Sequence, residues 1–103
     1  MTEVMISKIE PTEESEKYQG TKIELLEGLV HDLQEDDIMT FKEVVGMDSI
    51  SQEAENGADS INGKQFKVIH KINKSSFVIE CDSRARFTPY ERNGIAVKVK
   101  QKV

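Results

Sequence analysis

Cysteine, tryptophan and long apolar runs are scarce or absent in this chain of 103 residues. Its single cysteine, Cys81, cannot form an internal disulfide and cannot hold a zinc ion alone. No apolar run approaches the ~20 residues of a membrane span. The first residues also lack the basic start and apolar stretch of a signal peptide. We therefore expect a cytoplasmic or nuclear protein with no membrane partner.

Glycine is present but scattered. The six glycines occur singly and form no glycine-rich phosphate loop, which argues against ATP binding by this chain. Aromatic residues make up only 6% of the sequence, so there is little to stack on nucleic-acid bases. We therefore expect no nucleotide cofactor, and nucleic acid is not the favoured partner.

Charge is plentiful and unevenly distributed. The net charge is −5, but residues 1–59 carry 16 acidic and 4 basic side chains, whereas residues 60–103 carry 3 and 10. A basic half can bind nucleic acid or a ribosomal surface, here through residues 64–102. The favoured alternative is that acidic and basic strands lie side by side and pair across a sheet.

Short stretches of alternating apolar and polar residues indicate an all-β protein. We expect strands at residues 4–11, 21–27, 37–44, 66–72, 76–81 and 95–103. The polar run 12–19 is expected as an exposed loop, the acidic stretch 48–60 as a long mobile loop, and residues 87–92 as a short turn of helix. Six short strands predict a single domain over residues 1–103, folded as a small antiparallel β-barrel that is closed or nearly closed.

The barrel should enclose one apolar core. Its expected members are Phe41, Phe66, Phe77, Ile79 and Val97. In the strand 37–44 the alternation leaves open whether the odd- or even-numbered residues face inward. In the strand 95–103 we expect the odd-numbered residues, beginning with Ile95, to face the core.

Candidate catalytic groups are few. His31 stands among carboxylates that could be taken for a metal or acid–base site, but one histidine beside exposed acids is usually a polar turn. Cys81 ends a strand pattern without a neighbouring cation, which favours a buried apolar role over that of a nucleophile. His70 alternates with lysine on a strand and is read as structural. The sequence therefore predicts no catalytic residue, no metal site and no enzyme activity for this chain alone.

A set of short motifs, weak individually, is specific in its order and spacing. These motifs are residues 35–47 (EDDIMTFKEVVGM), 61–63 (ING), 77–82 (FVIECD) and 87–95 (FTPYERNGI). Together they resemble the first catalytic cysteine half-domain of the ubiquitin-activating enzyme, over nearly the whole chain. The resemblance implies a non-catalytic barrel, inserted in the inactive adenylation domain, that forms one wall of the ubiquitin-binding cleft.

The resemblance also implies a ubiquitin-facing turn. It consists of Val30, His31, Asp32, Leu33, Gln34, Glu35, Asp36 and Asp37. The family usually has Arg and Glu where Val30 and Gln34 stand here. The acidic residues of the turn would steer the basic face of ubiquitin towards it. By the same resemblance, ATP, magnesium and the thioester-forming cysteine belong to the adenylation domains and the second catalytic cysteine half-domain, which would be this chain's other partners.

Overall fold

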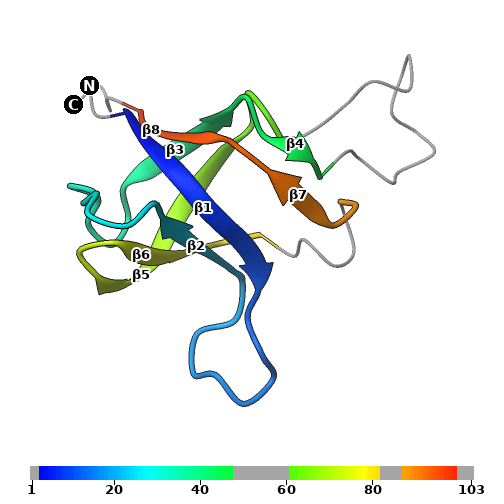
Figure 1. Cartoon of the computed structure of the whole chain (residues 1–103). Coiled ribbons are helices and arrows are strands. Elements are labelled where there is room, and N and C mark those ends of the chain that lie inside the picture. The colour runs from blue at the N-terminus through cyan, green and yellow to red at the C-terminus, as the bar shows by residue number, and fades with distance from the viewer. Residues whose placement is uncertain (1–2, 48–60, 82–86, 100–103) are drawn as a thin grey trace.

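The computed structural model describes residues 3–47, 61–81 and 87–99, and within them the chain forms eight strands and no helix (Figure 1). The strands are β1 (Glu3–Pro11), β2 (Thr21–Leu25), β3 (Ile38–Lys42), β4 (Val45–Gly46), β5 (Gln65–Asn73), β6 (Ser76–Ile79), β7 (Tyr90–Arg92) and β8 (Ile95–Lys98). Six of them close an antiparallel barrel in the order β1-β2-β6-β5-β3-β8, and β4 pairs with β7. The predicted all-β barrel is confirmed. The acidic stretch 48–60 lies outside the described residues.

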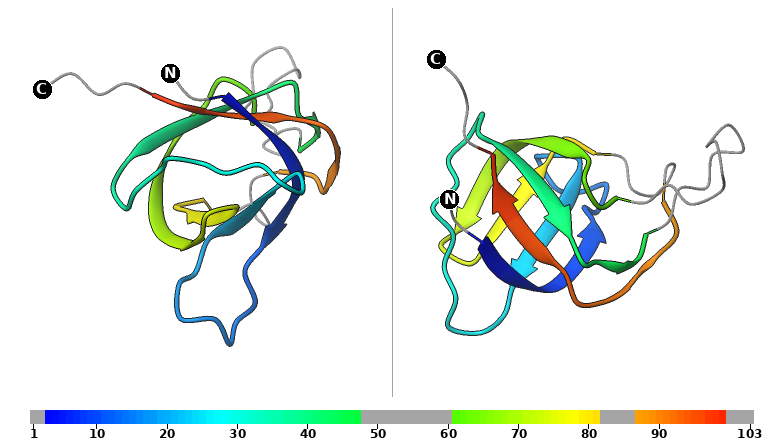
Figure 2. Two further views of the ribbon diagram at one scale, coloured as in Figure 1. Left: turned by 60° about the vertical axis from the view of Figure 1, so that its left-hand side comes forward. Right: turned by 90° about the horizontal axis from the view of Figure 1, so that it is seen from above.

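Strand β1 closes the barrel by pairing with a different neighbour along each half of its length (Figure 2). Glu3 to Met5 lie opposite β8, whereas Ile6 to Pro11 lie opposite β2. The register shifts between Ile6 and Lys8, and such a bulge lets a strand bend from one neighbour to the next. Closure gives every barrel strand two partners, which removes exposed edges. The described residues contain no helix that is long and apolar enough to cross a membrane.

The barrel interior is filled by large apolar side chains. Phe41 and Phe77 are almost fully buried, and Phe41 meets Phe66 edge to face at 5.7 Å between ring centroids. The five core residues expected from the sequence are all buried. In β3 the odd-numbered Met39 and Phe41 face the core, which settles the register that the sequence left open. Burying each such side chain contributes about 1.5–3 kcal/mol.

The prediction for β8 holds for Val97, which is buried, but is wrong for Ile95. Ala96, opposite Phe41, belongs to the core cluster, whereas Ile95 is only half-buried. Val97 is buried but lies outside that cluster. Residues directly opposite each other in a sheet lie on the same face, so Ala96 faces the core together with Phe41. The larger apolar residues suggested the opposite face.

The helical turn expected at residues 87–92 is also wrong, since Tyr90 to Arg92 form β7. Pro89 disfavours helix in the residue before it and has no N–H to donate. The backbone of Gly46 in β4 approaches this segment closely, because a Cβ there would lie 2.7 Å from Pro89 O. Gly46 also has a φ of 90°, which glycine adopts without strain. Pairing with β4 therefore replaces the helix.

Candidate partner-binding turn

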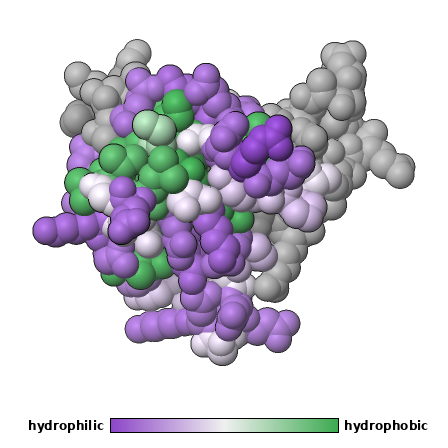
Figure 3. Space-filling model, in the orientation of Figure 1, coloured by the Kyte–Doolittle hydropathy of each residue, from purple (hydrophilic) through white to green (hydrophobic). Residues whose placement is uncertain are grey.

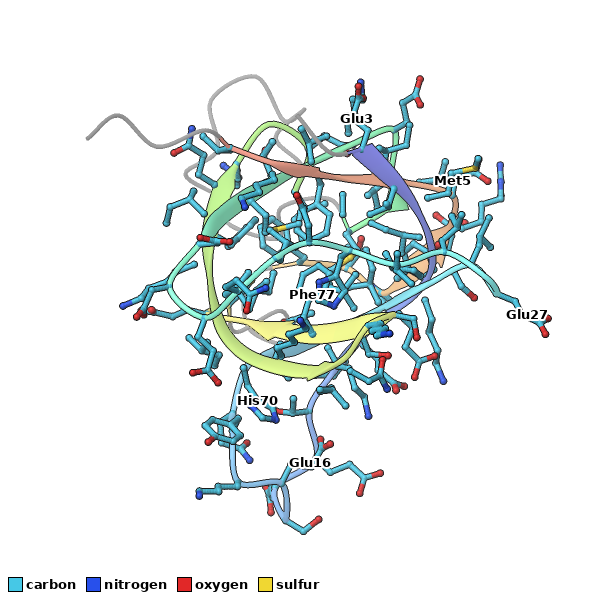
Figure 4. The ribbon with its side chains drawn as sticks, turned by 90° about the vertical axis from the view of Figure 1, so that its left-hand side faces the viewer. Glu3, Met5, Glu16, Glu27, His70 and Phe77 are labelled. Atoms are coloured by element: carbon cyan, nitrogen blue, oxygen red, sulfur yellow. The ribbon has the colours of Figure 1, made fainter. Side chains whose placement is uncertain are left out.

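Residues 30–37 connect β2 to β3 and cross one end of the barrel (Figure 4). Backbone hydrogen bonds fix one end of this turn to the β5–β6 hairpin loop and the other end to β5. The His31 N–H donates to Lys74 O at 2.9 Å, the Asp36 N–H donates to Val68 O at 2.8 Å, and the Val68 N–H donates to Asp37 O at 2.8 Å. The turn is therefore held as an extension of the sheet.

The buried side chain of His31 holds the turn against the barrel. Its ring is buried, its Nε2 lies 2.8 Å from Asn73 O and 3.2 Å from Ser76 O, and its Nδ1 accepts the Leu33 N–H at 3.2 Å. Two carbonyls around Nε2 and one N–H at Nδ1 define the neutral tautomer that is protonated at Nε2. The ring also meets Phe77 edge-on at 5.0 Å. Both nitrogens are thus engaged by backbone, and neither is free for a metal or a proton transfer.

The side chains of the turn divide into two sets. His31 and Leu33 are buried under the turn, while Val30 is 57% exposed. The remaining residues are exposed or half-buried at the surface: Asp32, Gln34, Glu35, Asp36 and Asp37. The structure thus brings together the residues that the resemblance groups, but two of the eight face the core and cannot contact a partner.

Two of the four acidic residues in the turn already have lysine neighbours. Asp36 lies 3.3 Å from Lys67 Nζ, and Asp37 lies 3.4 Å from Lys98 Nζ. Such exposed pairs contribute at most about 1 kcal/mol each, but they cancel much of the negative field. Both lysines come from the basic half of the sequence, so acidic and basic segments lie side by side here, as the favoured interpretation of the charge asymmetry predicts.

Glu35 lies near the second histidine. Its Oε1 is 3.5 Å from His70 Nδ1, which is shielded from solvent and makes no hydrogen bond in the structure. The other face of the imidazole stacks on Tyr18, with ring centroids 4.0 Å apart and planes 10° from parallel. Tyr18 belongs to the loop between β1 and β2. His70 is thus a structural contact between that loop and the barrel.

Cys81 and the carboxylates offer no second site. Cys81 is buried, and its carbonyl oxygen accepts the Thr21 hydroxyl at 2.8 Å. Its predicted role as a small buried apolar residue is confirmed. Among residues 3–47, 61–81 and 87–99, no three His, Cys, Asp or Glu side chains come close enough together to hold a metal ion. The turn is the feature of interest.

Comparison with known protein families gives a match over most of the chain. The family model of the ubiquitin-activating enzyme E1 FCCH domain matches residues 18–100. The chain belongs to this family. No curated protein matches it significantly. The match includes the whole turn and every strand from β2 to β8, while β1, which closes this FCCH barrel, lies before the matched range.

A groove of about 790 Å³ lies between β1 and the β4–β7 pair in this FCCH domain. Tyr90 forms part of its wall and donates its hydroxyl hydrogen to Asn93 O at 2.7 Å. Burial raises the pKa of Tyr90 above its ordinary value of 10.0. Met5 and Leu26 line the groove and are 55% and 40% exposed. Sequence reasoning missed these two residues. The consecutive pair Leu25-Leu26 was a usable signal, since neighbours in a strand face opposite sides.

Proposed function

We propose that this FCCH domain is the first catalytic cysteine half-domain of its enzyme and acts as a non-catalytic wall of the ubiquitin-binding cleft. Adenylation of ubiquitin with ATP and magnesium, and thioester formation, would be carried out by the adenylation domains and the second catalytic cysteine half-domain. The cytoplasm and the nucleus are the expected locations.

The observation that carries this proposal is the anchored turn. His31 and Leu33 are buried beneath it, and backbone hydrogen bonds tie its two ends to the β5–β6 loop and to β5. A turn held in this way loses little conformational entropy when a partner binds, which favours recognition by a preformed surface. The exposed residues available for that contact are Val30, Asp32, Gln34, Glu35 and Asp36, of which the last two also have basic neighbours.

The arrangement of the first and last described strands supports an inserted module. Strands β1 and β8 pair side by side, with Glu3 opposite Val97. A chain that enters and leaves a barrel at neighbouring points can sit within a loop of a larger domain at little cost to either fold. This agrees with a half-domain carried by an adenylation domain.

Binding of nucleic acid through residues 64–102 is less well supported. Lys67 and Lys98, which lie on the faces of β5 and β8, are neutralised by Asp36 and Asp37. Phosphate binding would require these lysines to leave their carboxylates. Binding to nucleic acid that weakens steeply as the salt concentration rises would favour this alternative.

The test is an amide chemical-shift titration of the ¹⁵N-labelled chain with unlabelled ubiquitin at low salt. Shifts on or beside residues 30–37 are the expected result, and an equal concentration of a small acidic protein serves as the control. The absence of any shift would contradict a ubiquitin contact. Exchange of ATP with pyrophosphate, or a ubiquitin thioester, on this chain would contradict the non-catalytic role.

A further inference from the structure

An apolar patch adjoins the candidate turn. Met5, Leu26 and Val30 are 55%, 40% and 57% exposed. The Leu26 N–H donates to Met5 O at 3.1 Å, so these two residues are neighbours across β1 and the end of β2. Leu26 and Val30 flank a tight turn in which the Leu29 N–H donates to Leu26 O at 3.0 Å. Figure 3 shows apolar surface gathered over the first half of β1 and the segment after β2.

The patch continues into the groove between β1 and the β4–β7 pair. Apolar side chains of the groove come from β1, β4, β8 and the residues beside them: Met5, Ile6, Leu26, Val44, Val45 and Ile95. Burying an exposed apolar side chain on association is favourable at about 25 cal/mol per Å². Contiguous exposed apolar surface of this kind marks interaction sites more often than scattered single residues do.

The rim of this surface is acidic. Glu43 and Glu91 line the groove, and Glu27 follows Leu26 on the side of the barrel that carries Met5 (Figure 4). None of these three carboxylates forms an ion pair with a described residue, and Arg92 is the one basic residue in the groove lining. Among the described residues, these three carboxylates carry negative charge without an ion-pair partner, as Asp32 does, whereas Asp36 and Asp37 are paired with lysines.

We propose that the patch and groove form a docking surface for a protein partner whose contact area is apolar and rimmed by lysine or arginine. The inference rests on the proposed function, in which that partner is ubiquitin, and it moves the main contact from the acidic turn to Met5, Leu26 and Val30. A second copy of this chain is the poorer occupant, because it would bring the acidic rims of two molecules together.

The test uses the full chain, labelled with ¹⁵N and titrated with ubiquitin at low salt, with two matched pairs of variants. Leu26→Ser is compared with Ile72→Ser, because both side chains are 40% exposed but Ile72 lies outside the groove lining. Glu91→Lys is compared with Glu14→Lys, which makes the same charge change in the β1–β2 loop. A native amide spectrum of each variant shows that it folds.

The expected shifts cover the patch and the groove lining as well as Val30. Leu26→Ser should weaken binding about three- to ten-fold, with no change for Ile72→Ser. Glu91→Lys should weaken it about three-fold or more at low salt, and the difference should shrink at high salt.

Three results would overturn the inference. Shifts confined to residues 32–37, with no effect of Leu26→Ser, would reject the docking surface and leave the proposed function intact. No shifts anywhere in the wild-type chain would reject both. Concentration-dependent sedimentation that Leu26→Ser abolishes would show that the patch joins two copies of the chain instead.

Discussion

Replacing His31 is the most direct test of the anchored turn. The His31→Ala variant has no imidazole, so Asn73 O, Ser76 O and the Leu33 N–H lose their hydrogen-bond partner. The edge-on contact with Phe77 is also lost. Because the site is buried, water cannot replace the ring at every partner. The turn should then be held chiefly by its backbone bonds to Lys74 in the β5–β6 loop and to Val68 in β5.

The expected cost follows from these contacts. The ring makes two hydrogen bonds, one from Nε2 that is shared between Asn73 O and Ser76 O and one that Nδ1 accepts from the Leu33 N–H. Each contributes about 1 kcal/mol net, and the backbone groups that remain buried without a partner raise the cost of losing them. The cavity left by the ring adds about 1–2 kcal/mol, less than for a fully apolar ring. The sum is about 3–4 kcal/mol, a large share of the roughly 5–15 kcal/mol that stabilises a domain.

The assay is urea unfolding followed by circular dichroism, since the chain has no tryptophan. With a slope of about 2 kcal/mol per M, the midpoint should fall by about 1.5–2 M. His31→Phe fills the space of the imidazole with a somewhat larger apolar ring and removes the hydrogen bonds, so it should still cost about 2 kcal/mol. The half-exposed His70→Ala is the control and should cost less than about 1 kcal/mol. Wild-type stability of His31→Phe would refute the argument that hydrogen bonds to the ring anchor the turn.

Three further predictions concern the barrel and the groove. The Asn62 side chain accepts the Val44 N–H and donates to Val44 O, both at 3.0 Å, so Asn62→Ala should cost about 2 kcal/mol in urea unfolding, and a change below about 0.5 kcal/mol would contradict it. Gly94→Ala should lower the melting temperature by about 10 °C, because φ is 115° and a Cβ would lie 2.7 Å from Val44 Cγ2; an unchanged melting temperature would reject that strain. The pKa of Tyr90 is raised by burial, so in a Tyr18→Phe variant, phenol absorbance at 295 nm should titrate above pH 10 in the folded chain and near 10 in urea. The stability contributed by Tyr90 is then complete below pH 10 and lost as pH rises through its folded pKa, whereas equal midpoints in the two states would contradict this.

The sequence predicts the architecture well because alternation is a local property. Strands β1, β2, β5 and β6 follow apolar positions that any closed barrel must bury, and the turn at Asn73 fixes the hairpin between β5 and β6. The register of β8 is different, because it depends on which residue lies opposite Phe41. Alternation within one strand carries no information on its neighbour, and hydrophobicity alone favoured Ile95 over Ala96.

Bulges are a second limit on prediction from alternation. In β5 the register shifts between Val68 and His70, so buried Phe66 and Val68 are followed by half-buried His70 and by Ile72, which is 40% exposed. An uninterrupted strand would have placed all four on one face. The extra residue turns the end of β5 and brings His70 between Glu35 and Tyr18. No pattern in the sequence predicts this contact.

The family resemblance predicts only part of the structure of the candidate turn. It identifies residues 30–37 as a unit, and the structure holds them as one by burying His31 and Leu33. It does not identify their partners, because Lys67 and Lys98 are distant in sequence and reach Asp36 and Asp37 only through barrel closure. Charge counted along the sequence therefore overstates the negative field of the turn.

Because Asp36 and Asp37 are paired with lysines, the salt dependence of partner binding can indicate which surface makes the contact. If a basic partner approached Asp36 and Asp37, it would compete with lysines already in place, and the gain in attraction would be small. Beside the groove, Glu27, Glu43 and Glu91 form no ion pair with a described residue, although Arg92 lines the groove and Lys42 lies within the field of Glu43. Attraction there is therefore reduced less than at Asp36 and Asp37, and it is screened within about 8–10 Å at physiological salt. A partner held mainly at the apolar patch would keep most of its affinity as salt rises and lose chiefly its rate of association. Salt that slows binding without abolishing it would therefore indicate docking at Met5 and Leu26, and proportionate loss of affinity would indicate contact through charge alone.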